Sequence, residues 1–444
     1  MSNLVIVVKI FKYLNKNLSP EHFINMISEI EVISLLNKAK TAREVLCIYE
    51  DYFDFFKKNE GSIILSDKTY QKGNLIFNDM FSGYEKYCKS LFKSNNFVFF
   101  NPDIVEKYGK GSCANIKIDW SVSYDSNFAR LIQDIITIRN FNKYKQKYEN
   151  LENLLKLLLN ENKNVQQDFI LYVIENIYKE NTDKSHILKN IEAVLKFFNL
   201  NVNSAEEISD MSVSSQIKLT DDIQNAKQLI DDTLDDSSFK NELQKMYKLY
   251  YLVLLKMVYL NKKLKSEKQK IKALVEFMHN ELYAITLREL SIAIEYFKEG
   301  KKDSGENKPS FFNKVNSDIG KNLLEYIKNM AWDFTLVRFL ELIFISKPNE
   351  DADFFIPFFL TLDKGLSEII DFYPLRSIVY FKKLNSIHPI PENDIDVVIE
   401  KNRLDEYFNS DAILERENKR QSVNDLMKHL NDLIECAEQK ILSI

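Results

Sequence analysis

The segment DFFIPFFLTLD, residues 353–363, holds an unbroken apolar run that leads into Thr361 and Asp363. A run this short and this rich in phenylalanine predicts a buried β-strand. Elsewhere the chain has few residues that interrupt helices, because its 444 residues include only nine Gly and eight Pro. The sequence therefore predicts a small sheet, an α/β core, inside a predominantly α-helical chain.

A second strand is predicted over residues 116–122, where apolar and polar residues alternate. Asp125 follows this strand, just as Asp363 follows the apolar run, and a helix is predicted to begin near Phe128. In open α/β sheets, ligands bind outside the carboxyl ends of the strands. Two carboxylates that meet there repel each other unless a cation neutralises them. We therefore expect Asp125 and Asp363 to share a Mg²⁺ or Mn²⁺ ion.

Two motifs around these acids resemble those of PIN-domain nucleases. VSYDSNFARL is similar to the Asp-x-Asn motif that opens that domain, and FFLTLDKGL is similar to its closing Leu-Thr-x-Asp-Lys segment. The resemblance implies a small parallel-sheet core whose acids bind one or two divalent metals. It carries over to Asp125 as the first acid, Asn127 as its polar companion, Asp333 of AWDFTLVRF as the third acid and Asp363 as the fourth.

The second acid of the family has several candidates in this chain. Glu289 in TLRELSIAIEYF is our choice, because the family places a glutamate early in an amphipathic helix; Glu281 and Glu276 are the alternatives. The resemblance covers short stretches within residues 116–140 and 266–385, and it requires a large helical insertion between the first and last acids. A surface insertion of this kind adds little loop-closure entropy.

The resemblance implies a metal-dependent nuclease that hydrolyses phosphodiester bonds, preferentially in RNA, and that acts as a toxin or in phage defence. A carboxylate-bound metal can activate water and neutralise charge on a phosphodiester. Asp125, Asp333 and Asp363 would hold the metal, and Glu289 would complete the site or position water. The residues expected to contact the substrate are Asn127, Lys364 and Arg376, with Lys382 or Lys383 on the same predicted strand as Arg376.

Each acid also has an ordinary structural explanation. An aspartate at a strand end commonly caps the next helix. Asp333 could cap a helix over residues 331–345, and Glu289 could be a solvated residue of a helix face. The chain would then be a non-catalytic interaction or scaffold subunit of a bacterial defence system, whose long helices bind a protein partner or a second copy.

Four regions are predicted along the chain. A helical N-terminal region is followed by a nuclease core in two pieces that flank a helical insertion, and a helical C-terminal region ends the chain. The predicted boundaries are 1–110 for the N-terminal region, 111–140 and 266–390 for the core, 141–265 for the insertion and 391–444 for the C-terminal region.

Charge and composition restrict the location and the partners. The formal net charge of −5, from 60 basic and 65 acidic side chains, predicts no broad polyanion-binding surface, so any contact with nucleic acid has to be local. The stretch NKKLKSEKQKIK, residues 261–272, is interpreted as a solvated helix surface, with a basic face toward nucleic acid as the alternative.

No run of eighteen apolar residues occurs, so no membrane span is predicted. The scattered Cys47, Cys88, Cys113 and Cys436 are typical of a reducing compartment, and a cytoplasmic location is expected.

Overall fold

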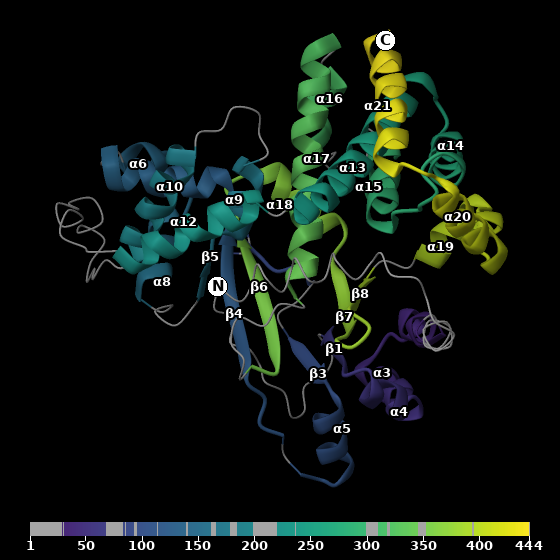
Figure 1. Cartoon of the computed structure of the whole chain (residues 1–444), viewed down its shortest axis with the longest axis horizontal. Coiled ribbons are helices and arrows are strands. Elements are labelled where there is room, and N and C mark those ends of the chain that lie inside the picture. The colour runs from purple at the N-terminus through teal and green to yellow at the C-terminus, as the bar shows by residue number, and fades with distance from the viewer. Residues whose placement is uncertain are drawn as a thin grey trace. The chain divides into compact units, whose positions relative to one another are not determined.

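The chain forms two compact units in the computed structural model, and each unit is assembled from segments far apart in the sequence (Figure 1). The first unit contains residues 1–240, 339–363 and 378–389, and the second contains residues 241–338, 364–377 and 390–444. The described residues are 29, 31–67, 83–84, 86–92, 96–112, 114–138, 141–160, 166–177, 184–198, 220–235, 237–298, 310–317, 320–344, 352–392 and 395–443.

One four-stranded sheet lies wholly in the first unit and has the order β2-β6-β4-β5. β4 pairs in parallel with both β5 and β6, whereas β2 pairs antiparallel with β6. All seven residues of β6 are buried, which explains why its sequence is apolar throughout. β2 pairs only with Phe359 and Leu360, so Pro357, which has no N–H group, lies beyond that pairing. The strands are β2 (Cys88–Lys89), β4 (Ile118–Tyr124), β5 (Gln166–Asp168) and β6 (Phe354–Leu360).

The other four-stranded sheet has the order β3-β1-β7-β8. Its β1 and β3 strands pair antiparallel. Beside the first residue of β1, Gly61, the ring of Phe381 lies against the rings of Phe55 and Phe56, with centroids 5.2 and 5.4 Å apart. The Tyr49 hydroxyl donates to the Gly61 carbonyl oxygen at 2.8 Å. These contacts fill the space around Gly61. The strands are β1 (Gly61–Ser66), β3 (Phe97–Phe100), β7 (Leu375–Phe381) and β8 (Ser386–Pro391).

Several helices of the first unit begin at capping residues. At the start of α3, the Thr41 hydroxyl accepts the Glu44 N–H, and the Glu44 carboxylate accepts the Thr41 N–H. Asn101 caps α5, which continues with Pro102. α9 packs on β4 and α10 packs on α6. The helices are residues 31–38, α3 (Ala42–Asp51), α4 (Phe53–Lys58), α5 (Pro102–Gly109), α6 (Ser126–Ile138), α7 (Phe141–Lys147), α8 (Leu151–Asn160), α9 (Ile170–Ile177), α10 (Lys184–Phe198) and α12 (Thr220–Asp235).

The second unit is built mainly from helices. α14 packs on α15, and α15 packs on α18. The Tyr247 ring stacks on Trp332 with centroids 4.6 Å apart, which joins α13 to α17. Two helices cross the division between the units, since α13 begins in the first unit and α17 ends there. The elements are α13 (Ser237–Lys263), α14 (Glu267–Asn280), α15 (Leu287–Phe297), η2 (Ser310–Phe312), α16 (Asn313–Ser317), α17 (Gly320–Ile343), α18 (Lys364–Phe372), α19 (Ile395–Asn402), η3 (Asp405–Tyr407), α20 (Ser410–Ser422) and α21 (Leu426–Leu442).

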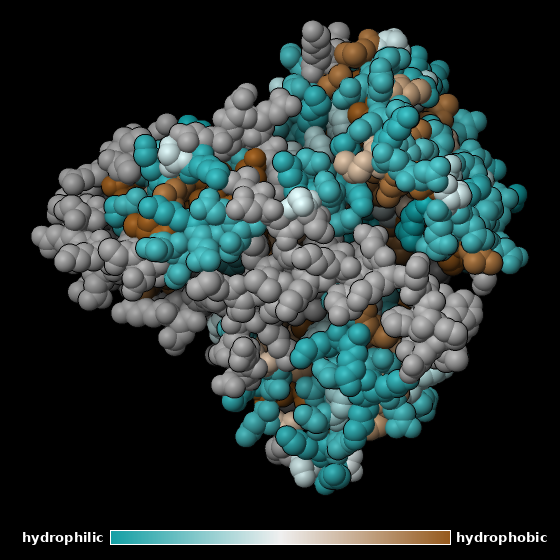
Figure 2. All heavy atoms as spheres, viewed as in Figure 1, coloured by the Kyte–Doolittle hydropathy of each residue, from teal (hydrophilic) through white to brown (hydrophobic). Residues whose placement is uncertain are grey.

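The predicted fold class, an α/β core within a predominantly helical chain, is confirmed. The compact units differ from the predicted regions, because residues 141–240, expected to form part of an insertion, group with the first unit. Hydrophilic side chains cover most of the described surface visible in Figure 2. Within the described stretches, no helix has the length and apolar character needed to cross a membrane. Cys47, Cys88 and Cys436 are free thiols, and Cys113 lies outside the described residues.

Candidate active site

An acid lies at or just beyond the carboxyl end of each of the three parallel strands β5, β4 and β6. Asp168 is the last residue of β5 and pairs with Ser123 of β4. Asp125 follows β4, and Asp363 lies three residues beyond the end of β6. Because the strands are parallel, their carboxyl ends meet at one edge of the sheet. The structure therefore brings Asp125 and Asp363 to the same edge.

Asp125 is almost completely buried, with 3% of its surface exposed. Its Oδ1 atom accepts the Phe128 N–H at 2.7 Å, which caps the start of α6. Its Oδ2 atom accepts the Thr361 hydroxyl at 2.6 Å. The exposed Asn127 side chain reaches the same oxygen only at 3.5 Å. Asp125 thus performs the capping role of an ordinary strand-end aspartate and is also tied to the end of β6.

Thr361 connects the two acids. Its hydroxyl donates to Asp125 and accepts the backbone N–H of Asp363 at 2.9 Å. Thr361 itself is buried, so this bridge is shielded from water. The hydroxyl thereby fixes the orientation of the Asp125 carboxylate relative to the turn that carries Asp363.

Replacing Thr361 by valine is expected to lower the free energy of unfolding by about 1–3 kcal/mol, because the buried Asp125 carboxylate and the partly buried Asp363 N–H each lose a partner. Thr361→Ser keeps the hydroxyl and is the matched control, expected to retain most of that stability. Urea unfolding at pH 8 measures both variants. Equal stability of Thr361→Val and the wild type would contradict the bridging role.

A third acid near Asp125 lies on α9. The Glu175 carboxylate accepts the Ser126 N–H at 3.1 Å, and the neighbouring Asn176 amide donates to the Ser126 hydroxyl at 2.7 Å. Glu175 was not among the predicted site residues, because residues 141–265 were assigned to a helical insertion. Its only sequence signal is the short polar strand Gln166–Asp168 followed by an apolar helix.

The surroundings of Asp125 disfavour its charge. Burial raises the pKa of Asp125 to about 7, and the nearby carboxylates of Glu175 and Asp363 act in the same direction, although the hydrogen bonds from Thr361 and Phe128 oppose them. Burial also raises the pKa of Asp168, against the hydrogen bonds that it accepts from Ile170 and Ser123. The carboxylates of Glu175 and Asp363 therefore lie close enough to Asp125 to disfavour its charge.

The candidate ligands for a divalent cation at this edge are the carboxylates of Asp125 and Asp363, which Thr361 connects. No group of three or more His, Cys, Asp or Glu side chains that could hold a metal occurs within the described residues, so Asp125, Asp333 and Asp363 are not gathered as one set of ligands. Mg²⁺ is commonly bound by one or two carboxylates, with water and substrate phosphate completing its coordination. Each oxygen of Asp125 accepts one hydrogen bond shorter than 3 Å and has a second lone pair for an ion.

Asp333 and Glu289, the other two predicted acids, belong to the second unit. The alternative that Asp333 caps a helix over residues 331–345 is wrong, because α17 begins at Gly320 and Asp333 lies in its middle. No Gly or Pro interrupts the helix between those two positions. Glu289 is in the first turn of α15, as expected, but it is buried rather than solvated. Burial raises its pKa, and Arg288 and Arg338 oppose the shift.

The alternatives to Glu289 lie on or next to α14. Glu276 is half exposed, accepts the Tyr407 hydroxyl at 3.4 Å and pairs with Lys272 at 3.9 Å. The backbone carbonyl of Glu281, the C-terminal cap of α14, lies 2.8 Å from the His429 Nε2 atom. Neither belongs to the edge of the sheet in the first unit.

The predicted phosphate-binding residues differ in their exposure and in their ion pairs. Lys364 is exposed and pairs with Glu368 at 3.6 Å. Arg376 is buried in β7, with 5% of its surface exposed, so the expectation of an accessible phosphate contact there is wrong. All seven residues of β7 are buried, so neither face of this strand is open to a ligand. Lys382 and Lys383 follow β7 and both pair with Glu60, at 3.7 and 3.6 Å.

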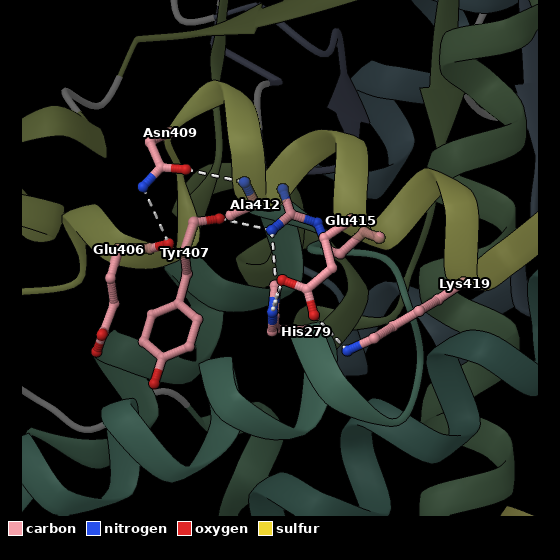
Figure 3. A network of polar contacts seen from close by, with 8 residues as sticks. His279, Glu406, Tyr407, Asn409, Ala412, Glu415 and Lys419 are labelled. Carbon is pink, nitrogen blue, oxygen red and sulfur yellow. Dashed lines mark hydrogen bonds and ion pairs between the residues drawn. The ribbon is translucent and has the colours of Figure 1, made fainter.

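A separate polar network in the second unit joins α14, η3 and α20 (Figure 3). The Arg416 guanidinium donates to the Tyr407 carbonyl oxygen at 2.6 Å and lies 3.1 Å from the Nδ1 atom of His279. The Nε2 atom of His279 lies 3.5 Å from Glu415, which also pairs with Lys419 at 2.6 Å. His279 and Arg416 are both buried. These contacts of His279 hold α20 against α14.

The network predicts that acid weakens the second unit. Burial lowers the pKa of His279, and Arg416 and Lys419 lower it further while Glu415 opposes them. The unfolded chain therefore takes up this proton first, so the stabilisation is complete above the ordinary histidine pKa of about 6.5 and declines as the pH falls below it. Urea unfolding between pH 7.5 and 5.5 should be less pH-dependent for His279→Gln than for the wild type. His186→Gln changes an exposed histidine and serves as the control; identical pH dependence of all three proteins would refute this role.

Comparison of the chain with protein-family models, with characterised proteins and with solved structures gives no match.

Proposed function

We propose that the first unit is a divalent-cation-dependent nuclease that hydrolyses phosphodiester bonds, preferentially in RNA, with Asp125 and Asp363 as its central acids. The observation that supports this proposal is the bridge from Asp125 through Thr361 to Asp363, at the edge where parallel strands end. A strongly perturbed carboxyl at such an edge is typical of a functional site.

In this proposal, Asp125 and Asp363 would hold a Mg²⁺ or Mn²⁺ ion. The bound ion would supply a water of lowered pKa and neutralise charge on the scissile phosphate. Thr361 keeps the Asp125 carboxylate in one orientation, and Glu175 adds negative charge that favours a cation beside Asp125. Asn127, exposed at the start of α6, would contact the substrate. We extend the proposal to a cytoplasmic toxin or phage-defence effector.

Cleavage of a labelled RNA in the presence of Mn²⁺ tests the proposal. Asp363→Asn is expected to reduce the rate by about two orders of magnitude or more, because it removes one of two carboxylates from the ion. Asp425→Asn is the matched control, since Asp425 is an exposed aspartate that caps α21. If Asp363→Asn and Asp425→Asn cleave as fast as the wild type, or if the wild type cleaves no RNA and no DNA, the proposal fails.

A second candidate is a helical interaction subunit without catalysis. It is favoured by the hydrogen bonds to both Asp125 oxygens, which give this aspartate a complete structural role as the cap of α6 and a tie to β6. Such a subunit would bind a protein partner or a second copy through its helices. Absence of cleavage together with indifference of the folded protein to Mn²⁺ would favour this candidate.

A further inference from the structure

The turn between α13 and α14 concentrates lysine side chains. Six lysines and one glutamate occur between Asn261 and Lys272. The stretch, which we call the hairpin tip, contains the last turn of α13, a connection of three residues and the first turns of α14, all within the second unit (Figure 1). Lys263, Lys265 and Lys268 are exposed.

These three lysines lack counter-charges. In the part of the chain that the structure describes, none of their three ammonium groups has an ion pair or a hydrogen bond. Other helix lysines are paired, as Lys57 is with Glu106 and Lys196 is with Glu192, both at 2.6 Å. Unpaired like charges on one short turn repel one another, and this repulsion is relieved when an anion binds.

Two further features add positive charge at the hairpin tip. The buried Lys270 reaches Asn261, not a carboxylate, with its ammonium 2.9 Å from the amide oxygen. α14 begins here with Ser266, whose side chain makes no capping hydrogen bond, so the positive end of the helix dipole adds to Lys265 and Lys268. The negative end of the α13 dipole offsets only the positive charge of Lys262 and Lys263, the lysines of the last turn of that helix.

We propose that the hairpin tip binds the phosphodiester backbone of a nucleic acid. Long, flexible lysine side chains suit a chain of repeated phosphates, whose affinity comes largely from counterion release. An anionic membrane fits less well, because the only apolar side chain between the exposed lysines, Leu264, is half-buried and provides no apolar face to insert. The choice of a nucleic acid as the polyanion rests on the proposed function. The excess positive charge of the hairpin tip is a property of the second unit alone.

Fluorescence anisotropy with a labelled single-stranded RNA, in EDTA to exclude cleavage, tests the hairpin tip in the full-length protein. The variant Lys263→Gln/Lys265→Gln/Lys268→Gln is expected to bind at least tenfold more weakly at 0.1 M salt. Its plot of log affinity against log salt should be shallower by about 2, since about three phosphate contacts are lost. The control is Lys38→Gln/Lys107→Gln/Lys110→Gln, which removes the same charge from exposed positions of the first unit and should change affinity less than twofold.

Three results would overturn the inference: equal losses in the two triple variants, no RNA binding by the wild type, or a loss confined to binding of phosphatidylserine vesicles. The last result would assign the hairpin tip to a membrane surface. Cleavage by the wild type in Mn²⁺, measured separately, reports on Asp125 and Asp363. Failure of the hairpin tip and failure of the proposed nuclease are therefore distinguishable.

Discussion

Asp125→Asn is expected to make the metal-free protein more stable at pH 8 and to abolish its metal-dependent cleavage of RNA. The asparagine oxygen can still accept the Phe128 N–H and cap α6, and the amide NH2 group, which replaces Oδ2, can donate to the Thr361 hydroxyl oxygen, so no charge is buried. The pKa of Asp125 is raised to about 7, so its protonated form favours the fold. That stabilisation is complete below the ordinary aspartate value near 4 and is lost as the pH rises to about 7.

The increase in the free energy of unfolding caused by Asp125→Asn should therefore reach about a few kcal/mol at pH 8 and disappear near pH 4. Urea unfolding in EDTA at the two pH values measures it. Asp425→Asn makes the same substitution at an exposed cap, and we expect it to change stability by less than about 0.5 kcal/mol at either pH. A loss of stability at pH 8 on replacing Asp125 would contradict the picture of a carboxylate whose charge the fold tolerates poorly.

Gly61→Ala is expected to destabilise the first unit by about 3 kcal/mol. A Cβ atom at this position would lie 2.5 Å from the Phe56 ring and 2.8 Å from the Phe381 ring. Both rings are fully buried, and the Tyr49 hydroxyl holds the Gly61 carbonyl oxygen, so neither the rings nor the strand can shift freely. Urea unfolding monitored by circular dichroism measures the loss.

Gly109→Ala is the matched control for this substitution. Gly109 ends α5, and apart from its chain neighbours and the backbone of its own helix, no atom lies within 4 Å of the Cβ that alanine would add. Alanine is favoured over glycine in a helix, so this variant should gain up to about 1 kcal/mol. If the two alanine variants had equal stability, the crowding at the start of β1 would not be the constraint that we infer.

The strands at this edge of the sheet could be predicted because their patterns are local. β6 is apolar along its whole length, and β4 alternates before Asp125, so both strand ends and their acids are visible in the sequence. The capping role of Asp125 was also foreseeable from its place between a strand and a helix. The Thr361 bridge to Asp125 spans 236 residues and depends on the parallel register of β4 and β6, which no local pattern specifies.

Other features of the structure could not be predicted from the sequence, for physical reasons. β5 has only three residues, all polar, so the pairing that brings Asp168 and the following Glu175 to Asp125 had no hydrophobic signal. A strongly apolar stretch follows Asp333 and suggested that a helix starts there, but neither Gly nor Pro interrupts the chain at this point, so α17 continues through it. Arg376 is buried because both faces of β7 are covered, and this depends on tertiary packing that no local sequence pattern specifies.

Isothermal titration of Mn²⁺ into the full-length protein tests the central claim most directly, because binding is measured without any assumption about substrate. We expect one Mn²⁺ site in the wild type and in Asp425→Asn, and loss of that site in both Asp125→Asn and Asp363→Asn. Binding of Mn²⁺ that is unchanged by either substitution, or no binding in the wild type, would contradict the account of Asp125 and Asp363 as partners at one ion.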